Sequence, residues 1–215
     1  MSDKSEFEGV IGMLKQVDWL FFDVGSTLVD ESRANEHRIL DAIKGTIITY
    51  DQAYTQAVQL AKQKNAHPLK ALGLPLTPWH SEDERVYPQA TNCLAELHKN
   101  YKIGVIANQI PGTADRMKSY GLYPYLDLII ASAEEGVEKP DLRIFEIALE
   151  RAKCRPENAV MIGDRIDNDI VPAKQKGMIT IWIRQGFGGM AENLTVEETP
   201  DYCVRNLQEL VDFLN

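Results

Sequence analysis

Two aspartate-containing stretches carry residues that could do chemistry, and each follows a short apolar run. Asp23 ends an apolar run near the N-terminus, and a small-residue turn leads from it to Thr27. Asp164 and Asp169 follow the apolar run 159–162. A carboxylate at the end of a buried strand is costly unless something compensates its charge. Carboxylates that meet would repel one another, and a hard cation such as Mg²⁺ would suit them. A turn-capping role for Asp23 is the plainer alternative.

A parallel sheet is the element that could bring these residues together. From Gln89 onward, helical and strand patterns alternate along the chain. The patterns predict helices over 89–99, 113–121 and 141–153, and strands over 102–107, 126–131, 159–162, 178–183 and 202–204. This alternation is typical of an α/β fold with a mostly parallel sheet and helices on both faces. The carboxyl ends of parallel strands share one edge, where ligands bind, so we expect Asn108 and Lys139 beside the aspartates.

The segment between the first strand and Gln89 has a different pattern. Residues 33–44 carry apolar side chains on one helical face, and Thr49 with Gln52 has the spacing of a capping box that opens a helix through Lys64. A helical insert is therefore expected directly after the first strand. The predicted organisation is a core formed by residues 1–30 and 89–215 and a small α-helical cap over 31–88.

The polar clusters together resemble the motifs of a known enzyme family. Asp23 with Thr27, then Lys139-Pro140-Asp141, then Gly163-Asp164 with Asp169, are similar to the motifs of the haloacid dehalogenase superfamily of hydrolases. The resemblance covers nearly the whole chain in the right order, including the insert after the first motif. It implies a Rossmann-like core with a cap, and a Mg²⁺-dependent hydrolase that acts on a small phosphorylated metabolite.

The resemblance also implies roles for individual residues. Asp23 would attack phosphorus and form an aspartyl-phosphate, and Lys139 would balance the charges of the carboxylate and the phosphate. Thr27 would hydrogen-bond the phosphoryl group. The family takes a second donor from a hydroxyl at the end of the second strand, where this chain has Ala107. Backbone N–H groups near Asn108 remain as the substitute, so Asn108 is the second predicted substrate-binding residue.

The metal site implied by the resemblance is built from oxygen ligands. Asp23, Asp164 and Asp169 would contribute carboxylates, and Gly25 would contribute its backbone carbonyl. Mg²⁺ is usually held by one or two carboxylates together with water and substrate oxygens.

Position 25 departs from the family pattern. Family phosphatases carry a second Asp there, which protonates the leaving group and then activates water, whereas this chain has Gly25. General acid–base help is typically worth roughly 10²–10⁴-fold, so phosphatase chemistry should be weakened.

A weak or inactive phospho-ligand-binding or regulatory protein is therefore one alternative. A phosphonatase-like hydrolase with a Schiff-base lysine is another, although the spacing of Lys44, Lys62, Lys64 and Lys70 singles none of them out. Family dehalogenases usually have a bulky side chain at this position, which argues against that activity.

Composition limits the partners and the compartment. The 215-residue chain has a net charge of −9 and a pI near 5.0, which argues against nucleic acid and anionic membranes as partners. No apolar run approaches the roughly 20 residues needed to cross a bilayer. Cys93, Cys154 and Cys203 are isolated and odd in number, which favours reduced thiols in the cytoplasm. The expected partner is a small phosphorylated molecule, and the oligomeric state stays open.

Three further features have plain interpretations. Trp79 and His80 could touch substrate, but a packing Trp and a solvated His are favoured. The stretch from Gly186 to Gly189 follows a strand without opening a clear helix, so a flexible loop is the better interpretation. Arg165 is expected to form a salt bridge within its loop.

Overall fold

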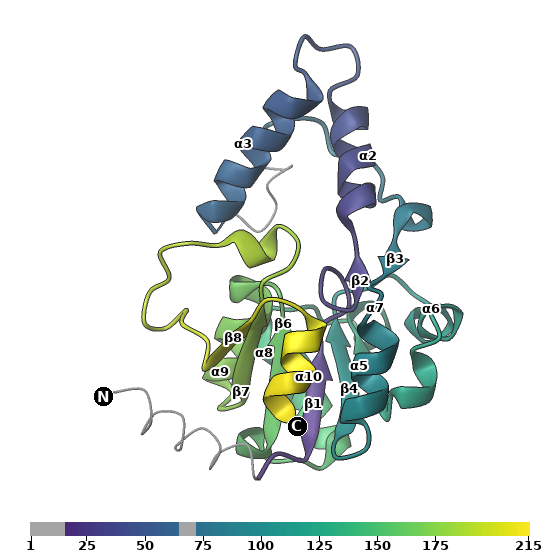
Figure 1. Ribbon diagram of the computed structural model, residues 1–215, viewed down its shortest axis with the longest axis vertical. Coiled ribbons are helices and arrows are strands. Elements are labelled where there is room, and N and C mark those ends of the chain that lie inside the picture. The colour runs from purple at the N-terminus through teal and green to yellow at the C-terminus, as the bar shows by residue number, and fades with distance from the viewer. Residues whose placement is uncertain (1–15, 65–71) are drawn as a thin grey trace.

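The protein is built around a six-stranded parallel sheet, seen in a computed structural model that describes residues 16–64 and 72–215 (Figure 1). The spatial order is β5-β4-β1-β6-β7-β8, and every neighbouring pair is parallel. The strands are β1 (Trp19–Phe22), β4 (Lys102–Ala107), β5 (Leu128–Ala131), β6 (Ala159–Gly163), β7 (Ile179–Ile183) and β8 (Tyr202–Val204). The predicted α/β fold is therefore confirmed.

Alternating side chains of the strands build two apolar layers, one on each face of the sheet. On one face, Leu20 and Phe22 of β1 pack with α5 (Ala90–Leu97) and α10 (Leu207–Leu214). On the other face, Phe21 packs with α8 (Leu142–Ala152) and α9 (Val171–Gln175). The shorter helices α6 (Thr113–Ser119) and α7 (Ser132–Glu135) complete the connections. Because both faces are covered, the strands are mostly apolar, and the polar residues of interest follow their carboxyl ends.

Strand β1 lies at the centre, and its register sets the position of the polar residues. Phe22 lies opposite Val105 of β4 and Ile162 of β6. The N–H of Asp23 still donates to the carbonyl of Ile162, at 2.9 Å. The residues that follow these three strands therefore begin at nearly the same height on the sheet edge.

The segment after β1 leaves the sheet and extends away from its carboxyl edge (Figure 1). It contains α2 (Ser32–Ala42), α3 (Tyr50–Lys62) and a 3₁₀ turn, η1 (Ser81–Asp83). Two short antiparallel strands, β2 (Val29–Asp30) and β3 (Arg85–Val86), pair at its base. The division into core and cap, with boundaries at 31 and 88, stays a prediction. No helix in these described ranges is long and apolar enough to cross a membrane.

Local signals set most of the element ends, with a few differences from expectation. Thr49 and Gln52 form the expected reciprocal capping box, but α3 ends at Lys62 rather than at Lys64. Strand β5 begins at Leu128 rather than at 126, because a 3₁₀ turn, η2 (Tyr123–Tyr125), precedes it. The β2–β3 pair and α10 were not among the predicted elements. Short strands of two residues leave no periodic pattern in the sequence.

Candidate active site

Three aspartates meet at the carboxyl edge of the sheet. Asp23 follows β1, Asp164 follows β6, and Asp169 lies in the single-turn π-helix η4 (Ile166–Ile170). One carboxylate oxygen from each lies within 4.8 Å of the others. Asp164 and Asp169 are buried, whereas the side chain of Asp23 is 14% exposed. The parallel sheet thus brings together the three residues that the sequence pattern pointed to.

Lys139 forms hydrogen bonds to two of these aspartates. Its Nζ donates to Oδ1 of Asp23 and to Oδ1 of Asp169, both at 2.6 Å, and to the carbonyl of Ile106 at 2.8 Å. The side chain is only 2% exposed. Burial lowers the pKa of the ammonium group, but the charges of Asp169 and Asp23 outweigh this effect and raise the pKa above its ordinary value. Lys139 therefore stays charged and compensates part of the buried negative charge.

The pKa values of the two buried aspartates are raised above their ordinary range. Burial raises the pKa of Asp169 to about 6, although Lys139 opposes this shift. Burial, with the charges of Asp169 and Asp23, raises the pKa of Asp164 well above its usual range. Within the described residues, Oδ1 of Asp164 is a buried oxygen without a hydrogen-bond partner. An unpartnered oxygen in an all-oxygen cluster of like charges fits a hard divalent cation.

Asp169 is held more firmly than Asp164. Its Oδ1 accepts from Lys139, and its Oδ2 accepts from the N–H of Arg165 at 3.0 Å. A Cβ at Gly163 would lie 2.3 Å from Oδ2 of Asp169, so a side chain at position 163 would collide with this carboxylate. Both oxygens of Asp169 thus already have protein partners.

The turn after Asp23 carries a buried hydroxyl. Thr27 is fully buried, and within the described part of the chain its Oγ1 has no hydrogen-bond partner. Gln185 fixes this turn, because its Nε2 donates to the carbonyls of Ser26 and Thr27, both at 3.0 Å. Ser26 takes a positive φ of 53°. The hydroxyl of Thr27 is therefore unused but lies below the molecular surface.

The side chain of Asn108 is hydrogen-bonded to the backbone of Lys139, whereas the predicted substrate contact concerned backbone N–H groups near Asn108. Its Nδ2 donates to the carbonyl of Lys139 at 2.8 Å, and its Oδ1 accepts from the N–H of Lys139 at 2.7 Å. The side-chain amide is thus engaged in holding the backbone that carries Lys139. Any contact with a phosphoryl group would have to come from the backbone, and the missing hydroxyl at Ala107 is not replaced by this amide.

A cavity of about 470 Å³ opens beside these carboxylates. Core residues on its wall include Asp164, Asn108 and Gly188, and the insert contributes Arg38 and Trp79. The guanidinium of Arg38 lies over the Trp79 ring, 5.4 Å from its centroid. Nε of Arg38 is buried and has no hydrogen-bond partner among the described residues. Trp79 thus lines the cavity, rather than only packing as the sequence favoured.

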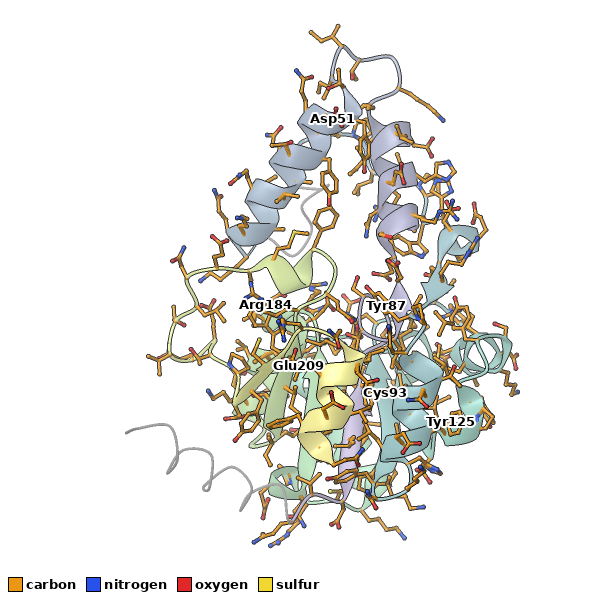
Figure 2. All side chains as sticks on the ribbon, in the orientation of Figure 1. Asp51, Tyr87, Cys93, Tyr125, Arg184 and Glu209 are labelled. Carbon is orange, nitrogen blue, oxygen red and sulfur yellow. The ribbon has the colours of Figure 1, made fainter. Side chains whose placement is uncertain are left out.

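The cavity lies near the junction between the sheet and the base of α2. Figure 2 shows the side chains that crowd this junction around Tyr87. The N–H of Tyr87 donates to the carbonyl of Leu28 at 3.1 Å, which links the end of the insert to the turn after β1. Glu31 and Glu84, near the two ends of the insert, both line the cavity.

Comparison with known proteins decides the family. The sequence profile of the haloacid dehalogenase-like hydrolases matches residues 17–177. The chain belongs to this family. Glyceraldehyde 3-phosphate phosphatase from Pyrococcus furiosus is 30% identical, with 94% of each chain covered. Pyrimidine 5'-nucleotidase YjjG from Escherichia coli is 27% identical over 92% of this chain and 97% of its own. Among solved structures, the magnesium-bound HAD-hydrolase YfnB from Bacillus subtilis matches with a TM-score of 0.67 at 22% identity, over 93% of this chain and 99% of that one. This match supports the fold.

Glu31 is a residue of this hydrolase's site that the sequence analysis missed. It precedes α2 and lines the cavity, and its Oε2 accepts from Oγ of Ser26 at 3.0 Å. A Cβ at Gly25 would lie 2.3 Å from Oε1 of Glu31. Burial raises the pKa of Glu31 to about 8, helped by the charges of Asp23 and Glu84 and opposed by the hydrogen bond from Ser26. No spacing in the sequence marks this residue, because only the path of the turn brings it to the site.

The glycine-rich stretch of this hydrolase also belongs to the site. Gly188 begins a 3₁₀ turn, η5 (Gly188–Met190), and a Cβ at Gly188 would lie 2.4 Å from Oδ2 of Asp164. A Cβ at Gly186 would lie 2.5 Å from Oγ of Ser26. The glycines thus permit close packing against Asp164 and against the turn that contains Ser26, which the sequence pattern alone did not indicate.

Two other side chains near the site are engaged with neighbouring carboxylates. His80 stacks on His37 with ring centroids 3.5 Å apart, and its Nε2 lies 2.9 Å from Oδ2 of Asp41. Arg165 lines the cavity and also forms the expected ion pair within its loop, 2.7 Å from Asp167. His37 and His80 are distant in sequence, so their pairing could not be inferred from spacing.

Proposed function

We propose that this hydrolase is a phosphatase that transfers the phosphoryl group of a small phosphate ester to Asp23 and then to water. The arrangement of Asp23 carries the proposal. One oxygen of its carboxylate is held by buried Lys139, and within the described residues Oδ2 has no hydrogen-bond partner. A fixed carboxylate with one available oxygen is suited to attack an electrophilic phosphorus atom.

The chemistry proceeds in two displacements on the same atom. An oxygen of Asp23 bonds to phosphorus while the bond to the alcohol oxygen breaks, and that oxygen leaves with the electron pair. Water then attacks the phosphorus of the aspartyl-phosphate, which releases inorganic phosphate and returns the Asp23 carboxylate. Lys139 keeps Asp23 oriented in both steps and offsets the negative charge that gathers around the phosphoryl group.

Mg²⁺ is the cofactor we propose. Asp23, Asp164, Asp169 and the carbonyl of Gly25 are the candidate ligands. The assignment is supported by Oδ1 of Asp164, which has no hydrogen-bond partner in the described part of the chain. The bound ion would supply positive charge against the phosphoryl oxygens. Since both oxygens of Asp169 already have protein partners, we expect Asp164 to be the more important of the two aspartates for metal affinity.

The substrate class follows from the cavity and the relatives. About 470 Å³ suits a small metabolite. The curated relatives described above are named for phosphate esters of small molecules, which supports a small phosphorylated metabolite here. On the insert side, Nε of Arg38 is buried without a hydrogen-bond partner among the residues that the structure describes, and its guanidinium lies beside Trp79. We propose that Arg38 binds an anionic or carbonyl oxygen of the substrate. Residues 31–88 would act as a cap, and a cytoplasmic location is expected.

The two alternatives, a Schiff-base phosphonatase and a regulatory protein, have less support than the phosphatase. Of the four lysines considered for a Schiff base, Lys44, Lys62 and Lys64 pair with Asp41, Glu192 and Glu198. None of these three lines the 470 Å³ cavity, and Lys70 lies outside the described residues. A regulatory protein without turnover is favoured only by Gly25 and Ala107.

The decisive experiment is a phosphate-release assay over phosphate esters, acyl phosphates and phosphonates, with and without Mg²⁺. We expect Mg²⁺-dependent release from esters, and loss of release in Asp23→Asn. Asp167→Asn is the matched control, because Asp167 is an exposed aspartate of the same site loop that pairs with Arg165. Equal activity of Asp23→Asn and the parent would contradict the proposal.

A further inference from the structure

An alkyl phosphate cannot be cleaved quickly unless the departing oxygen receives a proton. An alkoxide is a poor leaving group, and general acid help is typically worth roughly 10²–10⁴-fold. The position two residues after Asp23 offers none, because it is Gly25. Some other group on the cavity wall must therefore exchange this proton if alkyl esters are the substrates.

Three carboxyl groups line the cavity among the described residues: Glu31, Glu84 and Asp164. Glu84 is engaged through both oxygens, since it accepts from Nε1 of Trp79 at 2.6 Å and from the hydroxyl of Tyr120 at 2.5 Å. Asp164 belongs to the carboxylate cluster beside Asp23. Of the three, Glu31 is therefore the carboxyl group that can exchange a proton with the substrate.

The carboxyl group of Glu31 occupies the space that a side chain at position 25 would need. The three atoms nearest to a Cβ built on Gly25 are Oε1, Cδ and Oε2 of Glu31, at 2.3, 2.8 and 3.0 Å. The backbone of Gly25 does not have a positive φ, so its conformation does not require glycine. Glycine at 25 and a carboxyl group inserted from position 31 therefore fit each other sterically.

A simpler structural role for Glu31 does not account for its position. Glu31 stands at the N-cap of α2, yet its side chain makes no capping hydrogen bond. Asp30 meets that need instead, because its Oδ1 accepts from the N–H of Ser32 at 2.9 Å. The side chain of Glu31 turns to Ser26, in the loop that follows the nucleophile.

We propose that Glu31 is the acid–base residue of this enzyme, an inference that rests on the proposed phosphatase function. As Asp23 bonds to phosphorus and the ester bond breaks, the carboxylic acid of Glu31 gives its proton to the departing oxygen, which leaves as an alcohol. The resulting carboxylate then takes a proton from water while the water oxygen attacks the aspartyl-phosphate. Phosphate leaves, Asp23 is regenerated, and Glu31 again carries its proton.

The test compares Glu31→Gln with Glu36→Gln, a control at an exposed position of α2. Glycerol 3-phosphate has a leaving group that needs a proton, and 4-nitrophenyl phosphate has one that does not. For Glu31→Gln we expect kcat/KM to fall roughly 10²–10⁴-fold with glycerol 3-phosphate and far less with the nitrophenyl ester. Slow hydrolysis of the aspartyl-phosphate should also produce a rapid initial release of nitrophenolate, close to one per active site, in the variant.

A variant that moves the carboxyl group from position 31 to position 25 distinguishes a catalytic role of Glu31 from a role in folding. Glu31→Ala opens the space beside Gly25, and Gly25→Asp combined with Glu31→Ala should recover at least tenfold of the alkyl-ester activity that Glu31→Ala loses. Gly25→Asp alone should not help, because its side chain would collide with Glu31. If the parent cleaves no ester at all, the phosphatase proposal fails. If the parent cleaves glycerol 3-phosphate but Glu31→Gln equals Glu36→Gln, or loses both substrates equally with a lowered melting temperature, the inference about Glu31 is wrong.

Discussion

Replacing Lys139 by Met should reveal how much buried negative charge this one ammonium group supports. Met keeps most of the side-chain volume but leaves Asp169 and Asp23 without their 2.6 Å partner. Removing one member of a buried ion pair typically costs about 3–5 kcal/mol, mostly because the other charge stays buried and unpaired. For a chain of this size that loss corresponds to a fall in melting temperature of roughly 6–20 °C. Thermal unfolding measured with EDTA tests this, since a bound cation would replace part of the lost charge.

Two further variants make the result interpretable. Lys102→Met is the control, because Lys102 also pairs with an aspartate, at 3.0 Å, but its side chain is 62% exposed; it should change the melting temperature little. Adding Asp169→Asn to Lys139→Met removes the unpaired charge and should restore part of the lost stability. If Lys139→Met melts within a degree or two of Lys102→Met, or if the double variant is less stable still, the electrostatic account of the site is wrong.

Three other predictions test the site. Mg²⁺ should raise the melting temperature of the parent, and Asp164→Asn should lose most of that gain when both are measured by differential scanning fluorimetry. An equal response of the two proteins would mean that the ion binds elsewhere. Thr27→Val replaces a buried hydroxyl that has no hydrogen-bond partner within residues 16–64 and 72–215, so it should leave stability unchanged or slightly raised while lowering kcat/KM about tenfold. Unchanged kinetics would mean that Thr27 does not bind substrate. Arg38→Lys should raise KM about tenfold with little change in kcat, because lysine cannot present the planar guanidinium; a fall in kcat at constant KM would contradict a binding role.

The fold was predictable because buried parallel strands leave a strong signal. Lys102–Ala107 and Tyr202–Val204 were predicted with the bounds that the structure has. Both are short apolar or mixed runs between turn residues, in a chain where helix and strand alternate. The β2–β3 pair left no such signal, because each strand has two residues and pairs across more than fifty positions of sequence.

The gathering of the three aspartates was also predictable, since strands that run parallel end at one edge. The orientation of individual side chains was not. Asn108 uses both ends of its amide on Lys139, and Glu31 reaches the space beside Gly25 through a turn in which Ser26 has a positive φ. Such contacts depend on loop dihedrals and on side-chain rotamers, which residue spacing does not encode.

The source of the carboxyl group affects how catalysis is coupled to the rest of the molecule. A side chain at position 25 would be fixed to the nucleophile by two residues of backbone. Glu31 instead lies where β2 passes into α2, and its carboxyl group accepts a hydrogen bond from Ser26, in the turn after Asp23. Arg38, on the same helix, borders the same cavity. A substrate that contacts Arg38 would therefore act on the helix that positions Glu31, so that binding at the insert and protonation of the leaving group would depend on a single element.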